Sequence, residues 1–170
     1  MKQEFYEKLS KIVRKEQILK EEPMKKHTTF RIGGPAEYLI LPQTTEEIAD
    51  VVKLCRQEER PWYIVGNGSN LLVADEGVRG VVIQLLRNFN QIQVEGCQIR
   101  MQAGAQNAAV AKRALDASLT GFEFAAGIPG TIGGAVVMNA GAYGGEMKDI
   151  LKEVTVLDPN GMIRTIPAEE

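Results

Sequence analysis

Cysteine and histidine are scarce in this chain, which has two cysteines and one histidine among 170 residues. Cys55 and Cys97 match neither a disulfide framework nor the paired spacing of a zinc site, so a reducing compartment is favoured. Cys55 shares a predicted helical face with Val51 and Val52, and we expect a buried hydrophobe rather than a reactive thiol. His27 has no cluster of metal ligands around it, so we expect neither a metal site nor a Ser-His-Asp set.

An excess of charge of one sign is also missing. Twenty Lys and Arg stand against 22 Asp and Glu, which gives a net charge of -2. This balance argues against a nucleic acid or an anionic membrane as the main partner. An anionic small molecule is not excluded, because a loop of backbone N–H groups can hold phosphate without any excess of Lys or Arg.

The chain lacks a hydrophobic run that could cross a membrane. The 22 residues between Glu123 and Glu146 are all uncharged, but seven of them are glycine and one is proline. Such a segment would form a lone lipid-exposed helix poorly. The first five residues, MKQEF, lead directly into mixed charge, so we expect no secretory signal and a cytoplasmic protein.

The length fits one domain or two small lobes, and the 44% apolar fraction suffices for a core. Periodicity predicts an α+β chain with an amphipathic helix over 3–20, two strands within 28–41, a helix from Thr45 to about Glu58, strands at 62–65, 71–73 and 81–83, a hairpin of 92–94 with 99–101, a helix over 107–118, and a hairpin of 154–157 with 162–166 that turns at 158–161. The expected division is an N-terminal helix over 1–22 and two lobes, 23–88 and 89–170.

The loop Gly66-Asn67-Gly68-Ser69-Asn70 lies between two predicted strands. Its alternate glycines permit positive φ and close approach of a ligand, so successive N–H groups could form a nest for a pyrophosphate. Neither a Walker A loop nor the dinucleotide fingerprint is present, since Leu71 occupies the place of the third glycine. The alternative is a tight hairpin that merely requires glycine.

A second concentration of glycine covers residues 121–145, which hold eight of the 17 glycines. Each glycine costs an ordinary helix or strand about 0.5–1 kcal/mol relative to alanine, so this density needs a compensating role. Backbone approach to a bulky planar ligand would supply one. The alternative is an unusually tight crossing of the chain, with Pro129 and the glycines acting as turn residues.

Three further charged residues, Arg31, Glu123 and Glu146, are expected to have structural rather than catalytic roles. Arg31 could meet a phosphate, but we favour a salt bridge within the first lobe. Glu123 and Glu146 bracket the glycine-rich segment, and as lone carboxylates they are expected to be solvated rather than catalytic.

Four motifs together resemble one family. They are residues 26–36 (KHTTFRIGGPA), 65–73 (VGNGSNLLV), 127–135 (GIPGTIGGA) and 138–146 (MNAGAYGGE). These motifs are similar to those of the bacterial UDP-N-acetylenolpyruvoylglucosamine reductases, also called UDP-N-acetylmuramate dehydrogenases. The resemblance implies an α+β fold of the vanillyl-alcohol-oxidase type, with FAD between a smaller and a larger α+β lobe.

The resemblance also implies a chemistry and a set of site residues. In this family NADPH reduces a non-covalent FAD, which passes hydride to an enolpyruvyl group and gives UDP-N-acetylmuramate for peptidoglycan synthesis. The pyrophosphate of FAD would then be held by Gly66, Asn67, Gly68, Ser69 and Asn70. The flavin and its ribityl chain would be lined by Ile128, Pro129, Gly130, Thr131, Gly133, Gly134, Asn139, Gly141, Ala142 and Tyr143.

The chain departs from the family pattern at its end. A family member continues with a Tyr-Arg-x-Ser segment and a substrate domain that carries a serine proton donor and a glutamate. No residue here can inherit those roles, so we assign no catalytic residue and expect the 170-residue chain alone to be inactive. Two other hypotheses are a non-catalytic flavin- or nucleotide-binding module and another FAD oxidase of the same fold.

Overall fold

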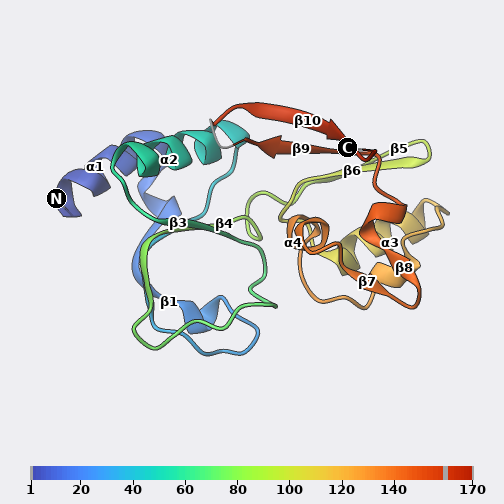
Figure 1. The fold of residues 1–170 in the computed structure, drawn as a ribbon, viewed down its shortest axis with the longest axis horizontal. Helices are drawn as coiled ribbons and strands as arrows, with labels where there is room; N and C mark the ends of the chain where they lie inside the picture. Colours follow the sequence, from blue (N-terminus) through green and yellow to red (C-terminus); the bar gives the residue numbers. More distant parts are fainter. Residues whose placement is uncertain (1, 159–160, 170) are drawn as a thin grey trace.

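The computed structural model describes residues 2–158 and 161–169. Figure 1 shows two groups of elements side by side, joined by the chain that leaves β4. The first group is a mixed sheet covered by two helices, and the second consists of short helices and two-stranded hairpins. This is the α+β arrangement that the periodicity predicts.

The sheet of the first group has the strand order β1-β2-β4-β3. Its strands are β1 (Ile18–Pro23), β2 (Pro35–Ile40), β3 (Trp62–Val65) and β4 (Val78–Gln84). β1 is antiparallel to β2, whereas β2 and β3 both run parallel to β4. Residues 81–85 are buried as a continuous apolar run interrupted only by Gln84, as expected for a central strand covered on both faces.

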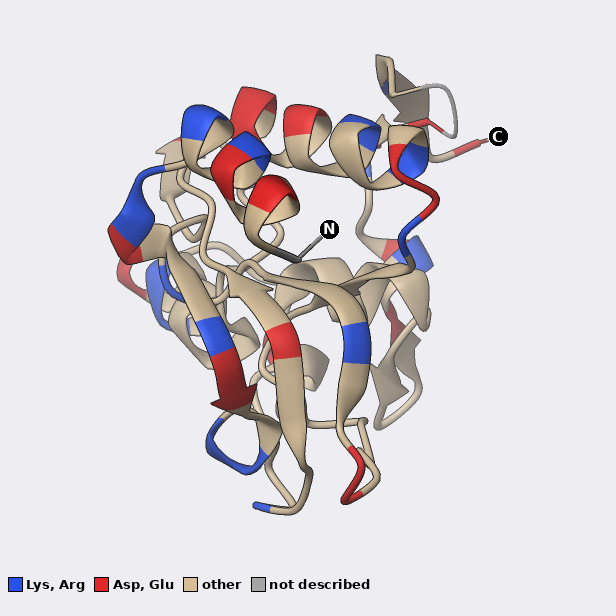
Figure 2. Ribbon diagram, turned by 90° about the vertical axis from the view of Figure 1, so that its left-hand side faces the viewer, with Lys and Arg blue, Asp and Glu red and all other residues tan. Residues whose placement is uncertain are grey.

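Helices α1 (Lys2–Ile12) and α2 (Thr45–Gln57) cover one face of this sheet. The hydroxyl of Thr44 caps α2 by accepting the N–H of Glu47 at 3.2 Å. Lys, Arg, Asp and Glu recur along the helices in Figure 2, while the strands carry fewer of them. The helices therefore keep their charged faces in water and bury their apolar faces on the sheet.

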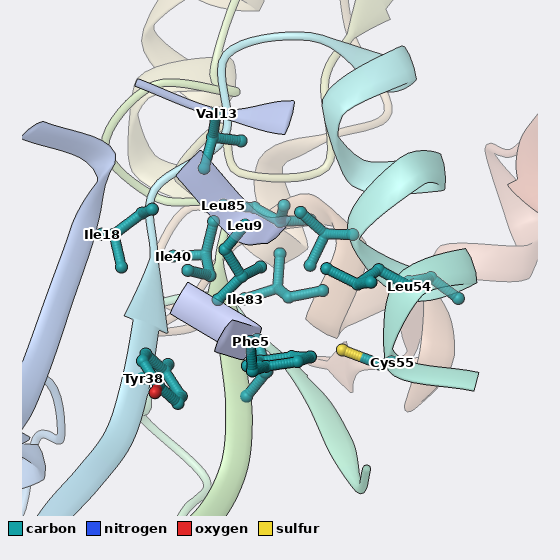
Figure 3. Close-up of a cluster of buried hydrophobic side chains, with 13 residues drawn as sticks. Phe5, Leu9, Val13, Ile18, Tyr38, Ile40, Leu54, Cys55, Ile83 and Leu85 are labelled. Atoms are coloured by element: carbon teal, nitrogen blue, oxygen red, sulfur yellow. The ribbon is translucent and has the colours of Figure 1, made fainter. Parts of the chain in front are cut away.

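The main core lies between these helices and the sheet. Eleven of its 13 buried side chains come from α1, α2 and the sheet, while Val13 and Leu85 directly follow α1 and β4. Phe5, Leu9, Tyr38, Ile83 and Cys55 converge in Figure 3. Cys55 is buried, as predicted, and burial raises the pKa of its thiol to about 12. Cys97 is exposed.

The second group begins with the predicted hairpin of β5 and β6. Its elements are β5 (Ile92–Glu95), β6 (Gln98–Met101), α3 (Asn107–Asp116), α4 (Ile132–Val137), β7 (Gly141–Ala142), β8 (Gly145–Glu146), β9 (Glu153–Leu157) and β10 (Ile163–Pro167). Single 3-10 turns lie at Lys15–Gln17 and Met24–Lys26 in the first group, and at Glu123–Ala125 and Met147–Asp149 in the second. A separate core gathers around Val110, Phe122 and Met147.

The hairpin of β9 and β10 confirms the prediction for the end of the chain, although Pro159 and Asn160 of its turn lie outside the described residues. Figure 1 shows this hairpin extending from the second group back toward α2. Leu157 of β9 packs against the core of the first group. The second group thus contacts the first at two places, through the chain that leaves β4 and through the hairpin of β9 and β10.

Three predicted elements are wrong. The N-terminal helix ends at Ile12, and residues 18–23 form β1, which extends the sheet beside β2. Residues 28–32 form no strand, since β1 takes the place beside β2 that the prediction gave them. Residues 71–73 form no strand either, and Leu72 is 74% exposed on the surface.

The described part of the chain contains no helix with both the length and the apolar character needed to span a bilayer. The longest apolar candidate in the sequence, residues 124–145, is divided among a short helix, turns and a two-stranded hairpin. The division of the chain into lobes at residue 88 stays a prediction.

Candidate functional site

The first predicted ligand loop, residues 66–70, follows the carboxyl end of β3. In sheets with parallel strands, ligands bind in the crevice outside these carboxyl ends. The backbone N–H groups of Asn67, Gly68, Ser69 and Asn70 make no hydrogen bond within residues 2–158 and 161–169. Four successive N–H groups are thus free to bind an anion, and the nest itself stays a prediction.

Gly68 shows why the loop needs glycine at its centre. Its φ of +62° lies in the left-handed region, and a Cβ there would collide with the backbone carbonyl of His27. The carbonyl of Gly68 accepts a hydrogen bond from the N–H of Thr29 at 3.2 Å. The close approach at Gly68 is therefore made by the protein itself, not by a ligand as the sequence analysis expected.

The two glycine segments meet although they are about 60 residues apart in the sequence. The hydroxyl of Ser69 donates to the carbonyl of Pro129 at 3.2 Å. A Cβ on Gly130 would lie 3.0 Å from the Ser69 hydroxyl, and one on Gly66 would collide with the hydroxyl of Thr131. The structure thus brings residues 66–70 and 128–131 together, as a shared ligand site requires.

Asn107, the first residue of α3, fixes the second segment in place. Its backbone N–H donates to the Gly130 carbonyl at 3.2 Å, and its side-chain amide donates to the Ile128 carbonyl at 3.1 Å. The side chain is buried, and its Oδ1 has no hydrogen-bond partner within the described residues. Asn107 cannot be identified from sequence alone, because nothing in an alanine-rich helix marks its first polar residue as the one that holds a distant loop.

Two glycines of the second segment have no role within the protein. Gly127 has a φ that any residue adopts and open space where a Cβ would stand. Gly134, in α4, also has an ordinary φ, and a Cβ there would meet only the Thr131 hydroxyl at 3.8 Å. Gly133 differs, since a Cβ would lie 2.8 Å from that of Ala103. Neither packing nor backbone conformation therefore requires glycine at 127 and 134.

The third predicted group, residues 139–143, belongs to the small hairpin of β7 and β8. The side-chain amide of Asn139 donates to Glu146 at 2.9 Å, and its oxygen accepts the N–H of Lys148 at 3.0 Å. Tyr143 adopts a φ of +53° and is 98% exposed. Among the described residues, no hydrogen bond joins this hairpin to the 66–70 loop.

The carboxylates at the ends of the glycine-rich segment are not the lone groups that the sequence analysis expected. Glu146 is held by Lys148 and Asn139, and these hydrogen bonds lower the pKa of its carboxyl below the ordinary value. Glu123 accepts hydrogen bonds from its own N–H, from Thr120 and from Gly121, which lower its pKa. Both groups therefore stabilise local turns.

A cavity of about 290 Å³ opens beside the 66–70 loop. It is lined by Lys26, His27, Thr28, Thr29, Arg31, Asn67, Gln84, Leu86 and Arg87. Within the described residues Arg31 makes no ion pair, so the predicted salt bridge is wrong. Its position in the cavity wall agrees with the alternative, contact with a phosphate. Gln84 and Arg87 could not be predicted as part of this cavity. Gln84 ends β4 and Arg87 follows it, and the apolar sequence of that strand indicates only a buried core element.

A family described as "FAD binding domain" matches residues 36–167 of this chain. The reductase named UDP-N-acetylenolpyruvoylglucosamine reductase from Alkaliphilus metalliredigens is 48% identical over 169 residues, which are 99% of this chain and 56% of that relative. The reductase of the same name from Clostridioides difficile is 49% identical over 168 residues, 99% of this chain and 55% of that relative. The chain spans a little over half the length of these curated relatives.

Solved structures agree with this result. The crystal structure of the UDP-N-acetylenolpyruvylglucosamine reductase from Thermus caldophilus matches with a TM-score of 0.72 and 39% identity, over 86% of this chain and 51% of that one. A p-cresol methylhydroxylase structure matches with a TM-score of 0.73 at 19% identity, over 96% of this chain and 35% of that one, and so supports the fold alone. The α+β fold of the vanillyl-alcohol-oxidase type is thereby confirmed. The matched residues place this chain in the FAD binding domain family.

Proposed function

We propose that this chain binds FAD non-covalently and forms the flavin-binding part of an NADPH-dependent UDP-N-acetylenolpyruvoylglucosamine reductase. One observation carries the proposal: the four unpartnered N–H groups of residues 67–70 lie in a loop that contacts the second glycine segment through Ser69 and Pro129. The reductase names of the relatives at 48–49% identity support the reaction and the UDP-sugar substrate.

Each segment would have its own part in binding. The N–H groups of Asn67 to Asn70 would surround the pyrophosphate oxygens, and Arg31 and Arg87 of the cavity wall would balance the charge. The backbone of residues 128–134 would line the flavin, where Gly127 and Gly134 leave the surface open. Gly141, Ala142 and Tyr143 would border the flavin from their hairpin.

Bound FAD would supply hydride transfer from NADPH to the enolpyruvyl group, which gives the cell-wall precursor UDP-N-acetylmuramate. The chain's own residues bind and orient the cofactor. No described residue is assigned to proton transfer. The reaction as a whole belongs to the reductase, which acts in the cytoplasm in this proposal.

Titration of the purified 170-residue chain with FAD tests the proposal. We expect quenching of flavin fluorescence with saturation at micromolar FAD, and release of intact flavin into the supernatant after acid precipitation. ADP should compete, because it carries the pyrophosphate. Protein that takes up no FAD would refute the proposal, and flavin retained in the acid pellet would refute the non-covalent link.

A non-catalytic nucleotide-binding module is the second candidate, because the anion nest by itself does not select a flavin. Binding of ADP and FAD with equal affinity would favour it. A clear preference for FAD over ADP would show that the second glycine segment contributes to affinity and would favour the flavoprotein.

A further inference from the structure

The end of α4 carries an asparagine at a position where glycine is usual. Asn139 has a φ of +42°, and its N–H donates to the Val136 carbonyl at 3.0 Å. The N–H of Ala140 donates to the Ala135 carbonyl at 2.8 Å. These two bonds form a Schellman motif, in which the residue with positive φ is most often glycine. Because glycine would satisfy this backbone at least as well, the asparagine side chain needs an explanation of its own.

The side chain of Asn139 ties the end of α4 to the chain that leaves the β7–β8 hairpin. Its amide nitrogen donates to Glu146 Oε2 at 2.9 Å, and its oxygen accepts the N–H of Lys148 at 3.0 Å. Glu146 also pairs with the ammonium of Lys148 and exchanges hydrogen bonds with Asp149. Both ends of the Asn139 amide are therefore engaged within the protein. Asn139, Glu146 and Lys148 are called the hairpin clamp below.

The hairpin that this clamp closes presents Tyr143 at its tip. Ala142 pairs with Gly145, so Tyr143 and Gly144 form the turn, with φ values of +53° and +87°. Two positive φ values are typical of a type I′ turn, which prefers Asn-Gly to a bulky first residue. The Tyr143 side chain is exposed and makes no hydrogen bond or ring contact within the described residues. A strained aromatic residue that packs on nothing in its own chain indicates a role toward a ligand.

The hairpin needs support from its surroundings. β7 and β8 have two residues each, and an isolated two-stranded hairpin is at best marginally stable. One support is the ring of Phe124, which would lie 2.9 Å from a Cβ on Gly145, so the backbone rests directly on it. The other support is the hairpin clamp, which fixes the angle at which the chain leaves α4. The direction in which Tyr143 points therefore depends on Asn139.

We infer that Asn139 is a positioning residue, which holds the β7–β8 hairpin so that Tyr143 lies against the flavin, an inference that rests on the proposed function. The family resemblance implies that Asn139 lines the flavin itself, whereas its hydrogen bonds give it a role through Tyr143. α4 also contains Gly134, where we propose that FAD approaches the backbone. The hairpin clamp thus fixes two parts of the proposed flavin site relative to each other.

Cleavage by chymotrypsin tests the clamp without FAD. This protease cuts after exposed aromatic residues, but only where the backbone can open into an extended form. Asn139→Gly keeps the positive φ and removes both side-chain hydrogen bonds. Cleavage after Tyr143 follows the population of the open hairpin, so the net loss of one hydrogen bond should speed it about fivefold. An unchanged rate, measured by mass spectrometry, would overturn the inference.

The fluorescence of bound FAD tests the role toward the flavin. A tyrosine that lies against the flavin quenches its fluorescence by donating an electron to the excited ring, which phenylalanine does far less readily. We expect Tyr143→Phe and Asn139→Gly each to raise the fluorescence of the FAD-saturated chain. In the double variant Asn139→Gly should add nothing, because the group through which it acts is absent. Additive increases would overturn the inference while FAD binding stands.

An exchange of hydrogen-bonding groups guards against a general loss of the fold. Asn139→Asp tolerates the positive φ but replaces the donor by a second carboxylate beside Glu146, so cleavage after Tyr143 should be fast. Glu146→Gln in the same chain returns a donor opposite the new carboxylate, and the cleavage rate should return to that of the wild type. Failure of this rescue would show that the bond between positions 139 and 146 does not hold the hairpin, and would overturn the inference.

Asn90→Gly is the matched control. Asn90 is also exposed, and its amide donates to the carbonyls of Leu86 and Arg87 in the chain between β4 and β5. This substitution should leave cleavage after Tyr143 unchanged, and an equal acceleration would overturn the inference. Absence of FAD binding in every variant would instead refute the proposed function, and the cleavage rates would still decide whether Asn139 holds the hairpin.

Discussion

Replacement of Gly134 by alanine separates the needs of the fold from those of the ligand. Gly134 lies inside α4 with an ordinary φ, and the added methyl would meet only the Thr131 hydroxyl at 3.8 Å, an ordinary contact distance. Alanine stabilises a helix relative to glycine by about 0.5–1 kcal/mol. Gly134→Ala should therefore raise the free energy of unfolding of the FAD-free chain by about that amount.

The same methyl group would stand where we propose that FAD approaches the backbone. We expect the affinity for FAD to fall about tenfold, which corresponds to about 1.4 kcal/mol. A variant that is more stable and binds its ligand less tightly cannot be explained by general damage to the fold. We therefore predict that Gly134→Ala raises the free energy of unfolding and at the same time lowers the affinity for FAD.

Gly133→Ala is the matched control. The neighbouring glycine has no room for a methyl group, since a Cβ would lie 2.8 Å from that of Ala103 and 3.1 Å from the Ala103 carbonyl oxygen. Overpacking of this kind costs about 1–3 kcal/mol. Gly133→Ala should therefore destabilise the chain, although both variants make the same chemical change in the same helix.

Urea unfolding of the FAD-free variants gives the stability, with an unchanged m-value as the requirement for comparison. Fluorescence titration then gives the FAD affinity of each folded variant. A stabilised Gly134→Ala chain with wild-type affinity would refute our placement of FAD against α4. Equal destabilisation by both substitutions would refute the packing argument for Gly134.

Three further predictions concern other parts of the chain. Gly68→Ala and Gly96→Ala each add a methyl group at nearly the same positive φ, but only the methyl at position 68 would meet the His27 carbonyl. Gly96→Ala should therefore cost about 1–2 kcal/mol of unfolding free energy and leave FAD affinity unchanged, whereas Gly68→Ala should cost more and weaken FAD binding. Equal effects of the two substitutions in urea unfolding and FAD titration would contradict this. A thiol reagent at pH 8 should label Cys97 in the folded chain and Cys55 only after unfolding. Because the pKa of the Cys55 thiol rises from 9.0 to about 12 on folding, its contribution to stability is fully present below pH 9 and is lost toward pH 12. Melting temperatures should therefore fall more steeply above pH 9 in the wild type than in Cys55→Ala. Anaerobic mixing of the FAD-loaded chain with NADPH and then UDP-N-acetylglucosamine enolpyruvate should give no turnover; reduction of the substrate would mean that a catalytic acid lies within the 170 residues.

The glycine loop after β3 could be predicted from sequence because its cause is local. Alternate glycines between apolar strands indicate a backbone-lined turn wherever they occur, and the structure has the turn at that place. What could not be predicted is the partner of each glycine. Gly68 faces the carbonyl of His27, which lies 41 positions earlier, and such a contact depends on how β1 and the loops around it pack.

β1 shows where local propensity fails. Residues 18–23 carry Lys and Glu, which favour a helix, and they continue the charge pattern of α1. Pairing of Ile18 with Ile40 and of Leu19 with Leu39 places them in the sheet instead. Their secondary structure depends on pairing with β2, which the periodicity of residues 18–23 alone does not reveal.

The contact between the buried side chains of His27 and Gln84 could not be predicted for the same reason. Along the sequence, His27 has no metal ligand or nucleophile at a recognisable spacing. Gln84 lies 57 positions away, at the end of an apolar strand. Only the sheet brings the two side chains together.

The return of β9 to the first core has a consequence for folding during synthesis. Leu157 packs against a cluster that otherwise consists mainly of residues 5–89, so that core is incomplete until the ribosome has made residue 157. Contacts this distant in sequence form late and slowly, because a long loop must close first. Until then the part of the first core that Leu157 will cover faces water, so the growing chain exposes apolar surface for the time that synthesis of residues 90–157 takes.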